Sequence, residues 1–176
     1  MRTIPLVLAA VLASAGAASA APAPRLPAAV QAYVAELNKS CREYGGAPTA
    51  APNLVKVADL NGDGLPDYLV NVGAYSCEGA ASAMGAGQFG ADVEIFAGGP
   101  GGTAAKAYEN AVYDAEIVTK AGKTEVWLMV SGEACGQKNA INLPFSDWKA
   151  CKRSLVWNAA KRQFVFAPLS MARPVE

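Results

Sequence analysis

The sequence predicts an α+β fold, in which an antiparallel β-sheet of about seven strands carries one N-terminal helix. One early segment has apolar residues at helical spacing, and short apolar runs bounded by turn residues fill the rest of the chain. No helical pattern separates these runs, although parallel strands would need helical crossovers. We therefore expect neighbouring strands to pair as antiparallel hairpins, with the helix packed on the sheet.

The first twenty residues have the order of a cleavable secretory signal peptide. Arg2 supplies a positive charge, residues 4–13 are apolar, and Ala18-Ser19-Ala20 provides the small residues that precede a cleavage site. The apolar stretch is shorter than the roughly 20 residues that span a bilayer as a helix. We expect residues 1–20 to be removed and the mature chain, without a membrane span, to be periplasmic or secreted.

The mature chain has the length of one domain. Residues 21–27 carry three prolines and are typical of an extended tether, and residues 28–176 are enough for a single hydrophobic core. The sequence contains 15 basic and 15 acidic residues, a balance that argues against a nucleic-acid partner. It leaves the oligomeric state open.

The helix is expected to begin at Pro27, which suits a first helical position, and to end before Gly45-Gly46. Between these points a stripe of apolar residues recurs at the i, i+3, i+4, i+7 and i+11 spacing of one buried face. Its members are Val30, Tyr33, Val34, Leu37 and Cys41. This stripe predicts which face of the helix packs on the sheet.

Short apolar runs separated by glycine, asparagine and lysine predict the strands, most of them in hairpins. The expected strands are residues 54–58, 68–72, 93–97, 112–119, 125–130, 154–157 and 164–166. Glycine-rich loops are expected at residues 73–90 and 98–102, and another long loop at 132–145. Two of these loops contain a cysteine, so they are either functional or held down by disulfides.

Four cysteines in an exported chain indicate two disulfides. Of the three possible pairings, we favour Cys41 with Cys77 and Cys135 with Cys151, because these pairs close the shorter loops. A zinc site would need close pairs such as C-x-x-C, and no two of these cysteines have that spacing. The cysteines are therefore expected to be structural.

Residues 59–67, here called the acidic loop, carry the main chemical signal of the chain. They read D-x-N-x-D-G-x-x-D, which places oxygen-bearing side chains at alternate positions around Gly64. Such closely spaced carboxylates repel one another without a cation, and calcium prefers about six to eight oxygen ligands. The expected ligands are the side chains of Asp59, Asn61, Asp63 and Asp67 and the carbonyl of Leu65. The alternative is a metal-free hairpin turn, since aspartate, asparagine and glycine are common turn residues.

The acidic loop differs from an EF-hand because the twelfth position holds Val70 instead of glutamate and no helices flank it. With apolar strands on both sides, it resembles the calcium loop of FG-GAP or VCBS repeats, the blades of integrin-type propellers. The chain has one such loop and no length for further blades. The resemblance therefore implies a single, structural calcium loop.

The chain as a whole also resembles small exported proteins of uncharacterised function from Gram-negative bacteria. That resemblance rests on residues 59–70 together with residues 151–158, where a cysteine and a tryptophan begin a C-terminal hairpin. It implies no particular activity.

The absence of histidine removes the usual general base and makes an enzyme unexpected. A carboxylate pair such as Asp92 with Glu94, or Glu78 with Glu133, is the remaining catalytic possibility, and it would require acids that converge in a cleft. Trp127 and Trp157 are expected in the core, whereas Trp148 follows a loop and is the best candidate for contact with a sugar or peptide.

These observations favour an exported, non-enzymatic binding domain with a structural calcium loop and an unidentified protein or glycan partner. The alternative is a periplasmic inhibitor of a hydrolase, which would act through a disulfide-held loop such as residues 131–145. A rigid, protruding loop would favour the inhibitor.

Overall fold

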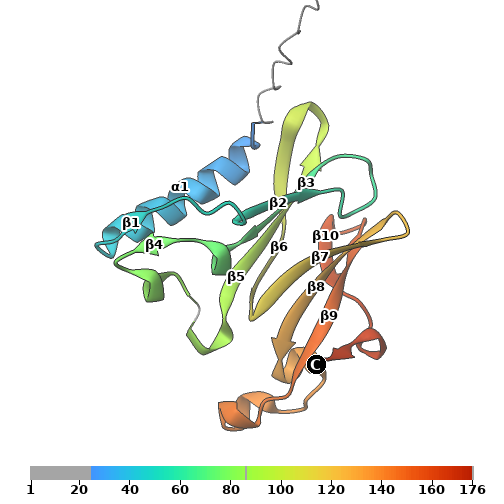
Figure 1. Cartoon of the computed structure of the whole chain (residues 1–176). Helices are drawn as coiled ribbons and strands as arrows, with labels where there is room; N and C mark the ends of the chain where they lie inside the picture. Colours follow the sequence, from blue (N-terminus) through green and yellow to red (C-terminus); the bar gives the residue numbers. More distant parts are fainter. Residues whose placement is uncertain (1–24, 86, 176) are drawn as a thin grey trace, which may run out of the picture.

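Two antiparallel sheets pack against each other, and a single helix covers the outer face of the first sheet (Figure 1). The computed structural model describes residues 25–85 and 87–175. The fold class is α+β, as predicted, with antiparallel pairing between all paired strands in this part of the chain. The expected signal peptide, residues 1–20, and residues 21–24 of the tether lie outside the described residues.

Helix α1 spans Ala28–Glu43. Its stripe faces inward as predicted: Val30, Leu37 and Cys41 are buried, and Tyr33 and Val34 are half-buried. Pro27 is the N-cap and not the first helical residue, because its ψ of 152° is extended. The helix ends where Gly45 takes a φ of 78°, a left-handed conformation that glycine adopts without strain.

The first sheet has the strand order β2-β3-β5-β6. Its strands are β2 (Val55–Ala58), β3 (Asp67–Asn71), β5 (Ala91–Gly99) and β6 (Thr103–Val112). The central strands β3 and β5 lie between the helix and the second sheet. Consequently Leu69, Val93 and Ile95 face the core between the sheets, whereas Val70 and Phe96 face the helix.

The second sheet has the order β10-β9-β8-β7. Its strands are β7 (Asp114–Lys120), β8 (Lys123–Ser131), β9 (Ala150–Asn158) and β10 (Gln163–Phe166), with the short β11 (Arg173–Pro174) also paired to β9. A separate ribbon joins β1 (Ala47–Pro48) to β4 (Cys77–Glu78). Figure 1 shows how the chain passes from β6 directly into β7, so that one bend links the two sheets.

The described residues form eleven strands, more than the sequence predicts. The main strand that the sequence analysis does not predict is β6, which is rich in alanine and polar residues with low β-propensity. Its backbone pairing with β5 stabilises it as a strand. The segment expected as a loop at residues 98–102 instead completes β5 and makes the tight turn of that hairpin. The other additions are the two-residue strands β1, β4 and β11.

Both favoured disulfides are formed. Cys41–Cys77 ties helix α1 to the β1–β4 ribbon, and Cys135–Cys151 ties a loop to β9. Among the described residues, no helix has the length and apolar character that crossing a membrane requires.

Candidate functional site

The acidic loop joins β2 to β3 at the point where Ala58 pairs with Asp67. Its chain reverses direction through Gly62 and Gly64, whose φ angles of 80° and 82° are left-handed. A side chain would oppose both conformations, so the two glycines allow the tight bend. The sequence prediction of a bend between two strands is therefore confirmed.

The acidic side chains turn toward the backbone of the loop itself. The Asp59 carboxylate accepts hydrogen bonds from the amides of Gly62 at 2.7 Å and Gly64 at 2.9 Å. Asn61 Oδ1 accepts from the Asp63 amide at 2.9 Å, and Asp63 Oδ1 accepts from the Leu65 amide at 2.8 Å. These bonds order the loop and hold three of the five expected ligands within one turn of chain.

Asp67 has a further role that the sequence did not indicate. It is fully buried, and its carboxylate accepts from the amides of Leu60 at 2.8 Å, Asn61 at 3.1 Å and Gly98 at 2.8 Å. Burial raises the pKa of Asp67, the three amides oppose that rise, and the nearby charge of Asp63 adds to it. Asp67 thus anchors the acidic loop to strand β5.

Gly98 is a supporting residue that sequence reasoning missed. A Cβ at this position would lie 2.1 Å from the carbonyl oxygen of Pro66, closer than atoms can approach. Glycine therefore permits β5 to pass against the loop while its amide reaches Asp67. Nothing in the glycine-rich run at residues 98–102 distinguishes Gly98, because its role depends on a contact with a distant part of the chain.

The donor set of the acidic loop has the chemistry that calcium prefers, since every expected ligand offers an oxygen. A carboxylate has about four lone-pair sites, so the amide bonds to Asp59 and Asp63 leave capacity for a cation. Within the described residues, no three His, Cys, Asp or Glu side chains are grouped as a metal cluster. The three aspartates among the expected ligands, Asp59, Asp63 and Asp67, are therefore not brought together as such a cluster. The other two expected ligands, the Asn61 side chain and the Leu65 carbonyl, belong to other classes.

A cavity of about 390 Å³ opens beside the acidic loop. The loop contributes residues 59–62 to its wall, and the turn between β7 and β8 contributes residues 121–124. Lys123 of that turn is exposed and pairs with Glu125 at 3.0 Å. The loop is therefore open to solvent on the side where the two sheets approach each other.

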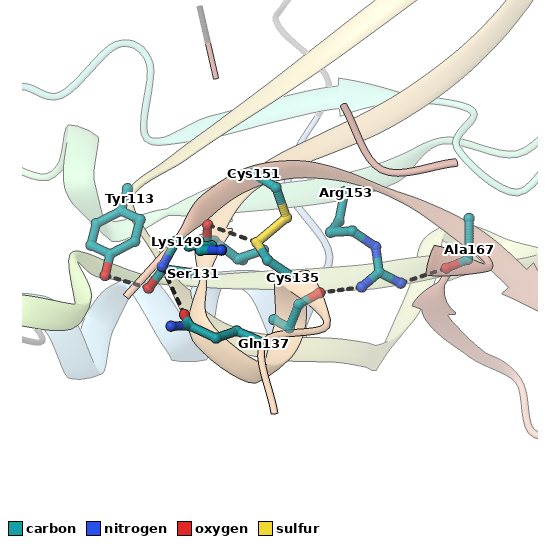
Figure 2. The surroundings of a disulfide bond; sticks show 10 residues. Tyr113, Ser131, Cys135, Gln137, Lys149, Cys151, Arg153 and Ala167 are labelled. Carbon is teal, nitrogen blue, oxygen red and sulfur yellow. Dashed lines mark hydrogen bonds between the residues drawn. A yellow bond between two sulfur atoms is a disulfide. The ribbon is translucent and has the colours of Figure 1, made fainter. Parts of the chain in front are cut away.

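Residues 132–149, here called the end loop, form the second candidate region. Figure 2 shows the Cys135–Cys151 disulfide, Gln137 and Arg153 around this loop. The Gln137 side chain donates to the carbonyl of Asp147 at 2.9 Å and accepts from the amide of Lys149 at 2.8 Å. The Gly132 amide also donates to the carbonyl of Lys149 at 3.0 Å. The two ends of the loop are thus fastened to each other.

Aromatic side chains gather at the end loop. Phe145 and Trp148 lie 5.3 Å apart between ring centroids, and Phe89 packs on both at 6.0 and 5.8 Å. Beside them is a cavity of about 290 Å³, here called the aromatic cavity. Its lining residues are Tyr113, Met129, Ser131, Phe145, Trp148 and Ala150. Nearby along the chain, Ile141 is 70% exposed and Leu143 is 41% exposed.

Of the three tryptophans, Trp127 is buried in the core as expected, whereas Trp148 and Trp157 are both half-buried. Trp157 packs against Phe164, and Trp148 lines the aromatic cavity. The ring of Trp148 packs over Gly132, where a Cβ would lie 2.8 Å from it. This tryptophan is therefore positioned by the glycine that begins the end loop.

Asp92 and Glu94, one of the two carboxylate pairs considered for catalysis, differ in their surroundings. Glu94 is 3% exposed and pairs with Lys106 at 2.9 Å, while Asp92 is exposed. Burial raises the pKa of Glu94 and Lys106 opposes the rise. The phenol of Tyr33 also has its pKa raised, first by burial and then by the charge of Glu94. This carboxylate lies under helix α1 and is closed to a substrate.

Comparison of the chain with protein-family models, with curated proteins and with solved structures found no match. The interpretation of both regions therefore depends on their own geometry and chemistry.

Proposed function

We propose that this protein is an exported, non-enzymatic binding domain that contacts a protein or glycan partner with its end loop and is stabilised by calcium at its acidic loop. The observation that carries the proposal is the construction of the end loop. The Cys135–Cys151 disulfide and the two hydrogen bonds of the Gln137 side chain hold the end loop rigid. The loop presents exposed apolar residues beside the aromatic cavity. Rigid apolar surfaces lose little conformational entropy when they bind.

Calcium at the acidic loop would act structurally. The ligands would be Asp59, Asn61, Asp63, Asp67 and the Leu65 carbonyl. The internal hydrogen bonds already order this turn, so an ion would have little chain to organise. Through Asp67 and the Gly98 amide, the ion would also strengthen the junction between the loop and β5. Extracellular sites of this kind bind with dissociation constants of about 0.1–1 mM.

A partner for the end loop would meet apolar and aromatic groups. Aromatic residues and tryptophan in particular are enriched at the centres of protein interfaces, and they also stack on sugars. Phe89 is 41% exposed and joins the aromatic cluster from a different loop. The surface therefore combines two loops that are distant in the sequence.

The rigidity of the end loop favours a second candidate, an inhibitor of a periplasmic hydrolase. Inhibitors of hydrolases commonly insert a rigid loop into a cleft and bind tightly because little reordering is needed. Here the disulfide and Gln137 provide that rigidity. This candidate uses the same surface and differs only in the class of partner.

The experiment is capture of partners from a periplasmic extract and on a glycan array, with the mature protein as bait. Leu143→Asp tests the end loop, and Val156→Asp on β9 is the matched control, because both side chains are 41% exposed. We expect Leu143→Asp to reduce capture at least tenfold and Val156→Asp to leave it unchanged. Equal capture by the two variants would contradict the proposal. Inhibition of purified proteases and glycosidases by the same proteins would separate the inhibitor from other binding modules.

A further inference from the structure

Arg153 is a positively charged side chain inside the core. It lies on the same face of β9 as Cys151 and Leu155, both of which belong to the core between the sheets, and it is only 7% exposed. Among the residues that the structure describes, no carboxylate pairs with it. A buried charge without a counter-charge is strongly unfavourable, so buried charges are normally paired.

The contacts of Arg153 satisfy the guanidinium in part. Its two terminal nitrogens donate to the carbonyls of Ala134 and Ala167, and Figure 2 labels the second of these partners. The Cζ atom of the guanidinium lies 4.7 Å from the ring centroid of Phe166. The remaining nitrogen, Nε, is buried and has no hydrogen-bond partner. Carbonyl oxygens and a ring face supply partial charges and leave the net positive charge in place.

Tyr108 is a second side chain on the Phe166 ring with a buried donor. Its ring meets the ring of Phe166 edge-on at 6.2 Å between centroids, so Tyr108 and Arg153 contact the same aromatic side chain. Its hydroxyl is buried and has no partner with hydrogen-bond geometry. Burial raises the pKa of Tyr108 to about 12, although the side chain of Asn110 is close enough to oppose the rise, and the phenol stays protonated and able to donate.

We propose that a small monovalent anion of the chloride class binds between Arg153 Nε and the Tyr108 hydroxyl and neutralises the buried guanidinium. Both donors belong to side chains that contact the Phe166 ring, and one carries a full positive charge; N–H and O–H donors beside a positive charge are the chemistry that a halide requires. A cavity of about 360 Å³, lined by Tyr108 and Phe164 with the opposite charges of Lys106 and Glu109 at its wall, opens to solvent beside Tyr108.

This anion would stabilise the junction at which Arg153 holds the end loop to the C-terminal segment, through Ala134 and Ala167. The site is independent of the acidic loop, which lies in a different part of the chain and takes a cation. Chloride and calcium should therefore stabilise the protein separately.

The test is thermal unfolding of the full mature protein at constant ionic strength, with sodium chloride exchanged for sodium gluconate. Gluconate is too large for a buried site of this kind. We expect the melting temperature to rise by about 3–6 °C between 1 and 200 mM chloride, with calcium removed throughout. Crystals grown in bromide should show an anomalous peak within hydrogen-bond distance of Arg153 Nε and the Tyr108 hydroxyl.

Two variants and two controls test whether the chloride response of the melting temperature comes from Arg153 and Tyr108. Tyr108→Phe keeps the ring and removes one donor, and should weaken the chloride response at least threefold; Arg153→Met should abolish it. The controls are Tyr113→Phe, whose hydroxyl bonds Ser131, and Arg173→Met, whose guanidinium stacks on Trp127. Both controls should respond as the parent does.

Three results would overturn the proposal. The first is a melting temperature that does not depend on chloride. The second is an equal chloride response in the parent and in Tyr108→Phe, which would indicate an adventitious ion only. The third is an ordered water, without a bromide peak, between the two donors. Tyr108→Phe keeps the test valid even if Arg153→Met fails to fold.

Discussion

The acidic loop and the end loop reach a fixed conformation by opposite means. In the acidic loop, most bonds join residues two to five positions apart, such as Asp59 with Gly62 and Gly64. In the end loop, the Cys135–Cys151 disulfide spans 16 positions and Gln137 reaches residues 10 and 12 positions away. Local bonds can be predicted from a sequence motif, whereas bonds across a loop depend on the fold that brings their ends together.

The largest expected effect concerns the end loop. Replacing Cys135 and Cys151 with serine should lower the free energy of unfolding by about 3 kcal/mol, because the cross-link restricts the unfolded chain. Hydrogen exchange should show lost protection in residues 132–149 and unchanged protection in residues 59–67. Urea unfolding measures the change in the free energy of unfolding. Loss of protection in both loops together would show that they unfold as one cooperative unit and would contradict separate ordering of the two loops.

Loss of the hydrogen bonds of Asp67, which include the long-range bond from Gly98, should have the next largest effect. The Asp67→Asn substitution turns one of the two carboxylate oxygens into an NH2 group, which donates and cannot accept. At least one of the three backbone amides that now bond the carboxylate would then lose its partner. We expect a loss of about 2 kcal/mol in the free energy of unfolding. Asp59→Asn, at a half-exposed position, is the control and should cost less than half as much. Equal losses would contradict the anchoring role of Asp67.

Loss of the Gln137 hydrogen bonds in the end loop should have an intermediate effect on stability. Gln137→Ala removes bonds to the backbone of Asp147 and Lys149 and should lower the free energy of unfolding by about 1.5 kcal/mol. The exposed Gln88 offers a matched control, since Gln88→Ala should change stability by less than about 0.5 kcal/mol. Chemical denaturation of both variants measures the difference. If Gln137→Ala is as stable as its control, the disulfide alone orders the loop.

The smallest effect is a dependence on pH at the acidic loop. The pKa of Asp67 is raised by burial, so between the ordinary value of 3.8 and its raised value the folded protein binds more protons than the unfolded chain. This contribution to stability is fully present below pH 3.8 and is lost as the pH rises through the folded pKa. The stability of the parent relative to Asp67→Asn should therefore fall as the pH rises across that interval, in calcium-free buffer. A constant difference across that interval would contradict the raised pKa.

Sequence patterns predicted the elements that depend on local order. Residues 28–43 form the expected helix with Val30, Leu37 and Cys41 buried, and the turn at Gly62 and Gly64 lies between two strands as expected. Both disulfide pairs also follow the favoured assignment. In each case, spacing along the chain carried the information.

Features that depend on tertiary contacts could not be predicted. Strand β6 has little β-propensity and exists through its pairing with β5. Gly98 is needed only because Pro66 passes close to it, and Arg153 looks like one of several surface cations until its place on the core face of β9 is known. The sequence also gives no sign that Phe89 joins Phe145 and Trp148, since the two loops are far apart along the chain.

Binding of calcium to the acidic loop is the central claim, and thermal unfolding with calcium or with chelator tests it most directly. Asp63→Asn is the decisive variant, because an amide oxygen can still accept from the Leu65 amide while the negative charge is lost. We predict that 5 mM calcium raises the melting temperature of the parent by about 2–5 °C relative to chelator and leaves Asp63→Asn unchanged. Identical melting curves for the parent with and without calcium would contradict the claim and leave the acidic loop as a turn held by its own hydrogen bonds.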